Sequence, residues 1–208
     1  MTTRHESQQL TGEILTPFDP NAGDVTEVRN LVLQSSLAEL QTHGYYERYL
    51  QHIPPSALED LVSRVAPGWA PVELALAHYK ACDDMNLTTE ELSAMGRSVG
   101  ERLQGTTLVS AAKTTRDESF DPWQVEAQLH RMWQRLYRGG TIQVTKLGAK
   151  EKLIEQRGFP MNRFHYHRQG LVWALGAAHT AVGLRLARIR VEKYEPTTHE
   201  VGVRISWL

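Results

Sequence analysis

The segment Leu171–Leu184, LVWALGAAHTAVGL, and the following residues 185–208, RLARIRVEKYEPTTHEVGVRISWL, decide the fold class of this chain. Small and apolar residues continue through several helical turns in the first part, which predicts a long helix over about residues 162–184. Apolar and polar residues alternate in the second part, which predicts two strands joined through residues 196–198. A helix that leads into such a hairpin is typical of an α+β protein.

A second hairpin is predicted before the long helix. Ile142 and Val144 alternate with polar residues, Gly148 marks a turn, and Leu153 lies in the returning strand. The two hairpins, separated by the long helix, predict a four-stranded antiparallel sheet with one apolar face. Helices must cover that face, so the helical N-terminal part is expected to pack on the sheet in an α+β layer.

The N-terminal half reads as mostly helical. Polar residues, prolines and glycines dominate positions 1–23, which predicts a flexible extension with a short extended piece at residues 13–18. Residues 24–208 are expected to form a single domain. The expected helices cover residues 24–42, 46–50, 56–65, 72–84, 88–104 and 121–139.

Composition narrows the classes of partner. Among 208 residues, 23 basic side chains balance 24 acidic ones. The net charge therefore gives no reason to expect nucleic acid or an anionic membrane as a general partner. Arg188 and Arg190 alternate onto an exposed sheet face, where cross-strand charge pairs explain them. The single cysteine, Cys82, excludes an intrachain disulfide framework and a cysteine-rich zinc site. The first residues have no secretory pattern, so a cytoplasmic location is expected.

One pair of residues and one helix start are candidates for a binding site. His78 and Cys82 are four residues apart, so they share a helix face and can offer nitrogen and sulfur to one ligand. The alternative is a buried histidine beside a small buried thiol. The start of the long helix, Phe164–His167, can attract an anion, or it is a solvated, aromatic-rich helix entry.

An aromatic stripe and a small-residue face supply the other candidates. His130, Trp133 and Tyr137 lie at helical spacing and can line a cavity, or form the core edge or a dimer contact. His179 stands among small residues from Gly176 to Gly183, with room for a flat ligand, and is the best candidate for an axial haem ligand. The alternative is close helix packing, which glycines permit.

Besides the order of the elements, five segments are distinctive: Tyr46–Leu50, Trp69–Glu73, Ala77–Tyr79, Cys82–Asp83 and Val203–Trp207. Together they resemble an uncharacterised bacterial family of the myxobacterial type. The final helix and hairpin are also similar to haem-NO-binding and 4-vinyl-reductase-type sensor domains, which bind small ligands and pass on a signal. The resemblance therefore implies a sensory domain, with haem as one candidate ligand.

We therefore expect a non-catalytic, homodimeric domain that binds a small apolar or flat ligand between the sheet and the long helix. One alternative is a small enzyme that uses a histidine with an acidic or tyrosine partner, and another is a protein-interaction module without a ligand. The chain has no nucleophile elbow, phosphate-binding glycine loop, dinucleotide fingerprint or HExxH motif. The expected cavity walls are Trp173, His179, His78, Cys82 and Trp133.

Overall fold

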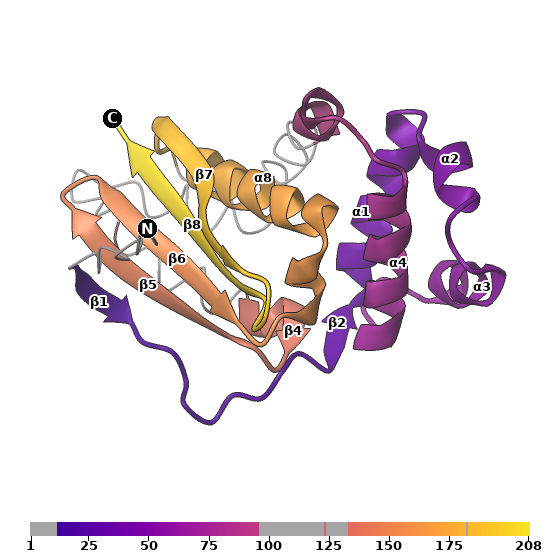
Figure 1. Cartoon of the computed structure of the whole chain (residues 1–208), viewed down its shortest axis with the longest axis horizontal. Coiled ribbons are helices and arrows are strands. Elements are labelled where there is room, and N and C mark those ends of the chain that lie inside the picture. The colour runs from indigo at the N-terminus through magenta and orange to yellow at the C-terminus, as the bar shows by residue number, and fades with distance from the viewer. Residues whose placement is uncertain (1–11, 96–122, 124–132, 182) are drawn as a thin grey trace, which may run out of the picture.

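The structure is a computed structural model that describes residues 12–95, 123, 133–181 and 183–208. It is an α+β fold, as predicted, in which helices and an antiparallel sheet form adjacent layers (Figure 1). Several predictions fall outside the described residues: the course of the helix after residue 95, most of the helix predicted from Asp121, and His130.

The larger sheet has five antiparallel strands in the order β1-β5-β6-β8-β7. The two predicted hairpins are confirmed. The prediction of four strands was one short, because β1 of the polar lead-in pairs with the edge of β5, where Glu13 stands opposite Lys146. The strands are β1 (Glu13–Thr16), β5 (Thr141–Gly148), β6 (Glu151–Arg157), β7 (Leu186–Glu195) and β8 (Glu200–Trp207).

Register places the core on one face of this sheet. Ile154 on β6 stands opposite Val144 on β5 and Val203 on β8, and all three are buried. On the opposite face Arg204 pairs with Glu151 at 2.8 Å and with Glu192 at 3.3 Å. Arg190 pairs with Glu192 on its own strand at 2.6 Å, so charge pairing on that face is confirmed for Arg190, while the cross-strand pairs come from Arg204.

Helix α8 (His165–Ala181) joins the two hairpins and follows a short 3-10 helix, η1 (Pro160–Arg163). The predicted helix was therefore too long by a few residues at each end. A methyl group at Gly176 would lie 3.6 Å from Leu186 Cδ1 and 3.8 Å from Ile189 Cδ1. Gly176 therefore faces β7, and a methyl group there would fit at ordinary van der Waals distances. Figure 1 shows α8 between the sheet and the layer that contains α1 and α4.

The helical layer contains α1 (Asn30–Thr42), α2 (Tyr46–Leu50), α3 (Pro55–Ser63) and α4 (Val72–Asp84). The last three agree closely with prediction. A further helix starts at residue 89, where the predicted capping box is present. The Glu91 amide donates to Thr88 Oγ1 at 3.2 Å, and the Thr88 amide donates to Glu91 Oε2 at 2.7 Å. In the described part of the chain no helix is long and apolar enough to cross a membrane.

A small sheet in the order β3-β2-β4 was not predicted. It consists of β2 (Glu27–Arg29), β3 (Trp69–Pro71) and β4 (Tyr137–Arg138). Two predictions were therefore wrong. No helix starts at Asp24, and the helix predicted from Asp121 does not continue to Gly139, because β4 occupies Tyr137–Arg138. Val28 is fully buried between Ala70 and Tyr137, so strand pairing with distant segments overrides its helical spacing to Leu31.

Candidate functional site

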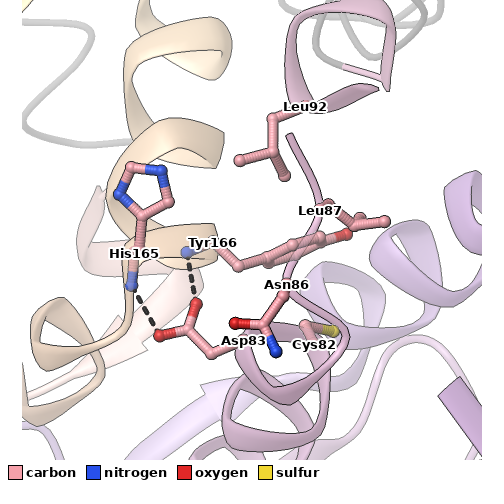
Figure 2. Close-up of a pocket in the computed structure, with 7 residues that line it drawn as sticks. All are labelled: Cys82, Asp83, Asn86, Leu87, Leu92, His165 and Tyr166. Carbon is pink, nitrogen blue, oxygen red and sulfur yellow. Dashed lines mark hydrogen bonds between the residues drawn. The ribbon is translucent and has the colours of Figure 1, made fainter. Parts of the chain in front are cut away.

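A cavity of about 240 Å³ lies where the end of α4 meets the start of α8. Its wall comes from the C-terminal turn of α4, from the helix that starts at residue 89, and from the first turn of α8 (Figure 2). Apolar and polar side chains both reach it. The lining residues are Cys82, Asp83, Asn86, Leu87, Leu92, His165 and Tyr166.

Asp83 holds the two helices together at this cavity. Its carboxylate accepts the backbone amide of His165 at 2.8 Å and that of Tyr166 at 2.6 Å (Figure 2). The first amides of a helix have no partner within it and favour an anion. The anion predicted for this helix start is therefore supplied by the chain itself. The alternative of a solvated helix entry is wrong, because Phe164, Tyr166 and His167 are buried.

A chain of polar side chains runs inward from the cavity. The hydroxyl of Tyr166 lies 3.0 Å from Ser36 Oγ, which lies 2.9 Å from His78 Nε2. On the other side of the imidazole, His78 Nδ1 lies 2.9 Å from the hydroxyl of Tyr49. This relay, Tyr49–His78–Ser36–Tyr166, joins α2, α4, α1 and α8. Two sets of donors satisfy these contacts. In one, Tyr49 donates to Nδ1, Nε2–H donates to Ser36, and Ser36 donates to Tyr166; in the other tautomer each of the three bonds runs in the opposite direction.

Burial keeps the relay uncharged. Desolvation lowers the pKa of His78 to about 3, so the imidazole is neutral at neutral pH. Burial raises the pKa of both Tyr49 and Tyr166. Burial also raises the pKa of Cys82 well above its usual value, and the Asp83 charge adds to this, while a hydrogen bond from Tyr166 opposes it. Cys82 is therefore a thiol rather than a reactive thiolate.

The structure brings His78 and Cys82 together as predicted, with 3.7 Å between Cys82 Sγ and His78 Nε2. Of the residues predicted to bind a ligand, Cys82 lines the described cavity, and so do His165 and Tyr166 of the anion site predicted at the helix start. Ser36, Tyr49 and Asp83 were not predicted for the site. They come from separate segments, so no sequence spacing relates them.

Trp133 and Tyr137 lie elsewhere, beside the small sheet. Their rings are 6.2 Å apart, and the Tyr137 ring stands edge-on to Phe159 at 5.2 Å. This stack extends the hydrophobic core there. Trp173 is half-buried on α8, outside the residues that line the cavity.

His179 is fully buried on α8, and its Nδ1–H donates to the Leu175 carbonyl at 2.6 Å. Burial and the charge of Lys152 lower the pKa of His179 to about 3, while the bond to Leu175 opposes the shift. His179 does not line the described cavity, so that cavity offers haem no axial ligand from this position. Within the described residues, no group of three or more His, Cys, Asp or Glu side chains can hold a metal ion.

Comparison of the chain with models of protein families, with curated proteins and with solved structures found no match in any of the three. The geometry of the cavity and relay is therefore the basis for assigning a function.

Proposed function

We propose that this protein is a non-catalytic regulatory domain that binds a small molecule in the cavity between α4 and α8. The observation that carries the proposal is the continuity between cavity and relay. Tyr166 lines the cavity and its hydroxyl contacts Ser36. A ligand that contacts Tyr166 therefore acts on hydrogen bonds that extend to α1, α4 and α2.

The chemistry of the relay favours binding over catalysis. A general base works best when its pKa is close to the working pH, and the His78 pKa of about 3 is far below it. The raised pKa of Cys82 likewise disfavours a thiolate nucleophile. A neutral, buried network instead suits two alternative hydrogen-bonding arrangements, one with and one without ligand.

The proposal predicts that ligand contacts spread from the cavity along the relay. Backbone amide NMR spectra recorded during titration with small-molecule fragments test it. Resonances of Cys82, Leu92 and Tyr166 should shift first, followed by those of Ser36 and Tyr49. Fragments that shift none of these resonances, or only resonances elsewhere, would contradict the proposal.

A pocket-filling variant sharpens this test. Leu87→Phe adds a ring to the cavity wall and should abolish the shifts. Leu31→Phe is the matched control, because Leu31 is 53% exposed on α1 and lies outside the cavity. Binding that survives Leu87→Phe at full strength would place the ligand outside this cavity.

A hydrolytic enzyme is the second candidate, on one specific observation. Ser36, His78 and Tyr49 follow one another at 2.9 Å, in the order of a nucleophile, a base and an orienting group. Hydrolysis of p-nitrophenyl acetate tests this candidate. Turnover that Ser36→Ala removes, while His52→Gln leaves it unchanged, would favour the enzyme; equal background rates in all three proteins would exclude it for this ester.

The homodimer, the cytoplasmic location and the likeness to sensor domains remain part of the proposal. A sensory role is consistent with a cavity whose occupancy is communicated to several helices.

A further inference from the structure

We propose that the cavity between α4 and α8 selects a small organic ammonium ion, with an apolar body, over neutral and anionic molecules of the same shape. This inference rests on the proposed function, because it names the class of ligand for the same cavity.

The charge of the described cavity wall comes from Asp83. The other lining residues are a thiol, an amide, two leucines, a tyrosine and His165, whose imidazole points away from the Asp83 carboxylate in Figure 2. Two ion pairs lie on residues close to the lining set. Arg48 lies 3.6 Å from Glu91, and Lys80 lies 2.5 Å from Asp84.

The Asp83 carboxylate has capacity for a further donor. Each of its oxygens accepts one amide of the α8 N-terminus, whereas a carboxylate offers about four acceptor positions. An ammonium group can therefore donate to Asp83 without displacing it from α8. A charge-assisted hydrogen bond of this kind is stronger than a bond from a neutral hydroxyl.

The same carboxylate disfavours an anion. Free amides at a helix start are a common anion site, but here those of His165 and Tyr166 already donate to Asp83. An anionic ligand would meet an occupied site and a like charge. Among ligands of the same shape, the cavity should therefore bind a cation most tightly and an anion most weakly.

The remaining wall suits the body of such a ligand. Leu87 and Leu92 supply apolar surface, and the ring of Tyr166 supplies an aromatic group that can attract a cation (Figure 2). The volume of about 240 Å³ is below the range of roughly 300–1,000 Å³ typical of sites for drug-sized molecules. The ligand is accordingly a compact amine rather than a macrocycle.

Three probes of nearly equal shape test the inference: benzylamine, benzyl alcohol and benzoate. Their affinities are measured by amide NMR titration of the whole chain at neutral pH. Benzylamine should shift the resonances of Asp83 and Tyr166 and bind at least tenfold more tightly than benzyl alcohol, and benzoate should bind weakest. Added salt should weaken benzylamine binding and leave benzyl alcohol unaffected.

Two aspartate variants complete the test. Asp83→Asn should reduce the affinity for benzylamine to that for benzyl alcohol, because the amide oxygen can still accept one of the two α8 amides but the side chain carries no charge. Asp84→Asn is the matched control, since Asp84 is adjacent, pairs with Lys80 and lies outside the cavity. If Asp83→Asn fails to fold, the ranking of the three probes on the native chain still decides.

The outcomes separate this inference from the proposed function. Equal binding of amine and alcohol in the cavity, or preference for benzoate, overturns the ammonium inference and leaves ligand binding at this site in place. Benzylamine binding that Leu87→Phe does not weaken overturns both, because the probe then occupies another site.

Discussion

The hydroxyl of Tyr49 lies 2.9 Å from Nδ1 of His78, and both side chains are fully buried. The raised pKa of Tyr49 and the lowered pKa of His78 keep both groups neutral, so the hydroxyl and the imidazole share one hydrogen bond. Tyr49→Phe leaves a buried imidazole nitrogen without this partner, which costs about 1–3 kcal/mol of unfolding free energy. Urea denaturation measures this loss.

Tyr46→Phe is the control for that substitution. Tyr46 lies on the same short helix, is half-buried, and packs its ring 6.2 Å from that of Tyr49. Removal of its hydroxyl should change the unfolding free energy by less than about 0.5 kcal/mol. Equal losses in the two variants would show that the bond to His78 contributes nothing specific.

Asp83→Ala should loosen the start of α8. The variant leaves the amides of His165 and Tyr166 without their acceptor, and loss of a helix cap costs about 0.5–2 kcal/mol. Hydrogen exchange of these two amides should accelerate more than exchange at Leu175, in the middle of the helix. Asp84→Ala removes only an exposed ion pair and should leave α8 exchange unchanged; acceleration in both variants would refute the capping role.

Acid should destabilise the protein from about pH 6.5 downward. Burial lowers the pKa of His78, His167 and His179 from the ordinary value of 6.5 to about 3. Between pH 6.5 and pH 3 the unfolded chain therefore binds more protons than the folded one. The contribution of these histidines to stability is therefore complete above about pH 6.5, and it is lost as the pH falls toward about pH 3. From pH 7.5 to 5.5 each histidine accounts for about 1 kcal/mol, and the three together account for a few kcal/mol.

Urea denaturation at a series of pH values measures this slope. His167→Phe should reduce it by about one third, since it removes one of the three buried imidazoles. His52→Gln changes an exposed histidine and should leave the slope as it is. A flat stability profile between pH 7.5 and 5.5 would contradict the assignment of neutral, buried histidines.

Lys152 should produce a second, separate dependence at higher pH. Burial lowers its pKa to about 7 from an ordinary value of 10.5, so the unfolded chain again binds more protons between these values. Stability should rise from pH 7 to 9, before the buried tyrosines and Cys82 act in the opposite direction. In Lys152→Met this rise should be absent, whereas Lys150→Met, at an exposed position, should retain it.

The fold was predictable where local periodicity and burial coincide. Helix α4 and both hairpins follow their apolar patterns because each buries one continuous face. Strand β1 was only a short extended piece in prediction, since its residues are exposed or half-buried and leave little pattern. The helical spacing of Val28 was misleading because its true partners, Ala70 and Tyr137, come from distant segments.

The candidate site was predictable only in part, for a related reason. His78 and Cys82 are four residues apart on one helix, so sequence alone places them together. Ser36, Tyr49 and Tyr166 reach His78 or one another only after α1, α2 and α8 have packed against α4. Long-range contacts between helices leave no periodic trace in the sequence.

Two glycines should respond in opposite directions to the same substitution. Gly139 has a φ of +86°, and a methyl group there would lie 2.2 Å from the carbonyl oxygen of Asp24, so Gly139→Ala should lose more than about 2 kcal/mol. Gly170 lies exposed on α8, and a methyl group there would meet nothing within 4 Å, so Gly170→Ala should gain about 0.5–1 kcal/mol. Thermal and urea unfolding of both variants measure the two changes. Changes of opposite sign would support the backbone geometry at both positions. A loss of stability in Gly170→Ala as large as that in Gly139→Ala would show that Gly170 is not exposed on α8.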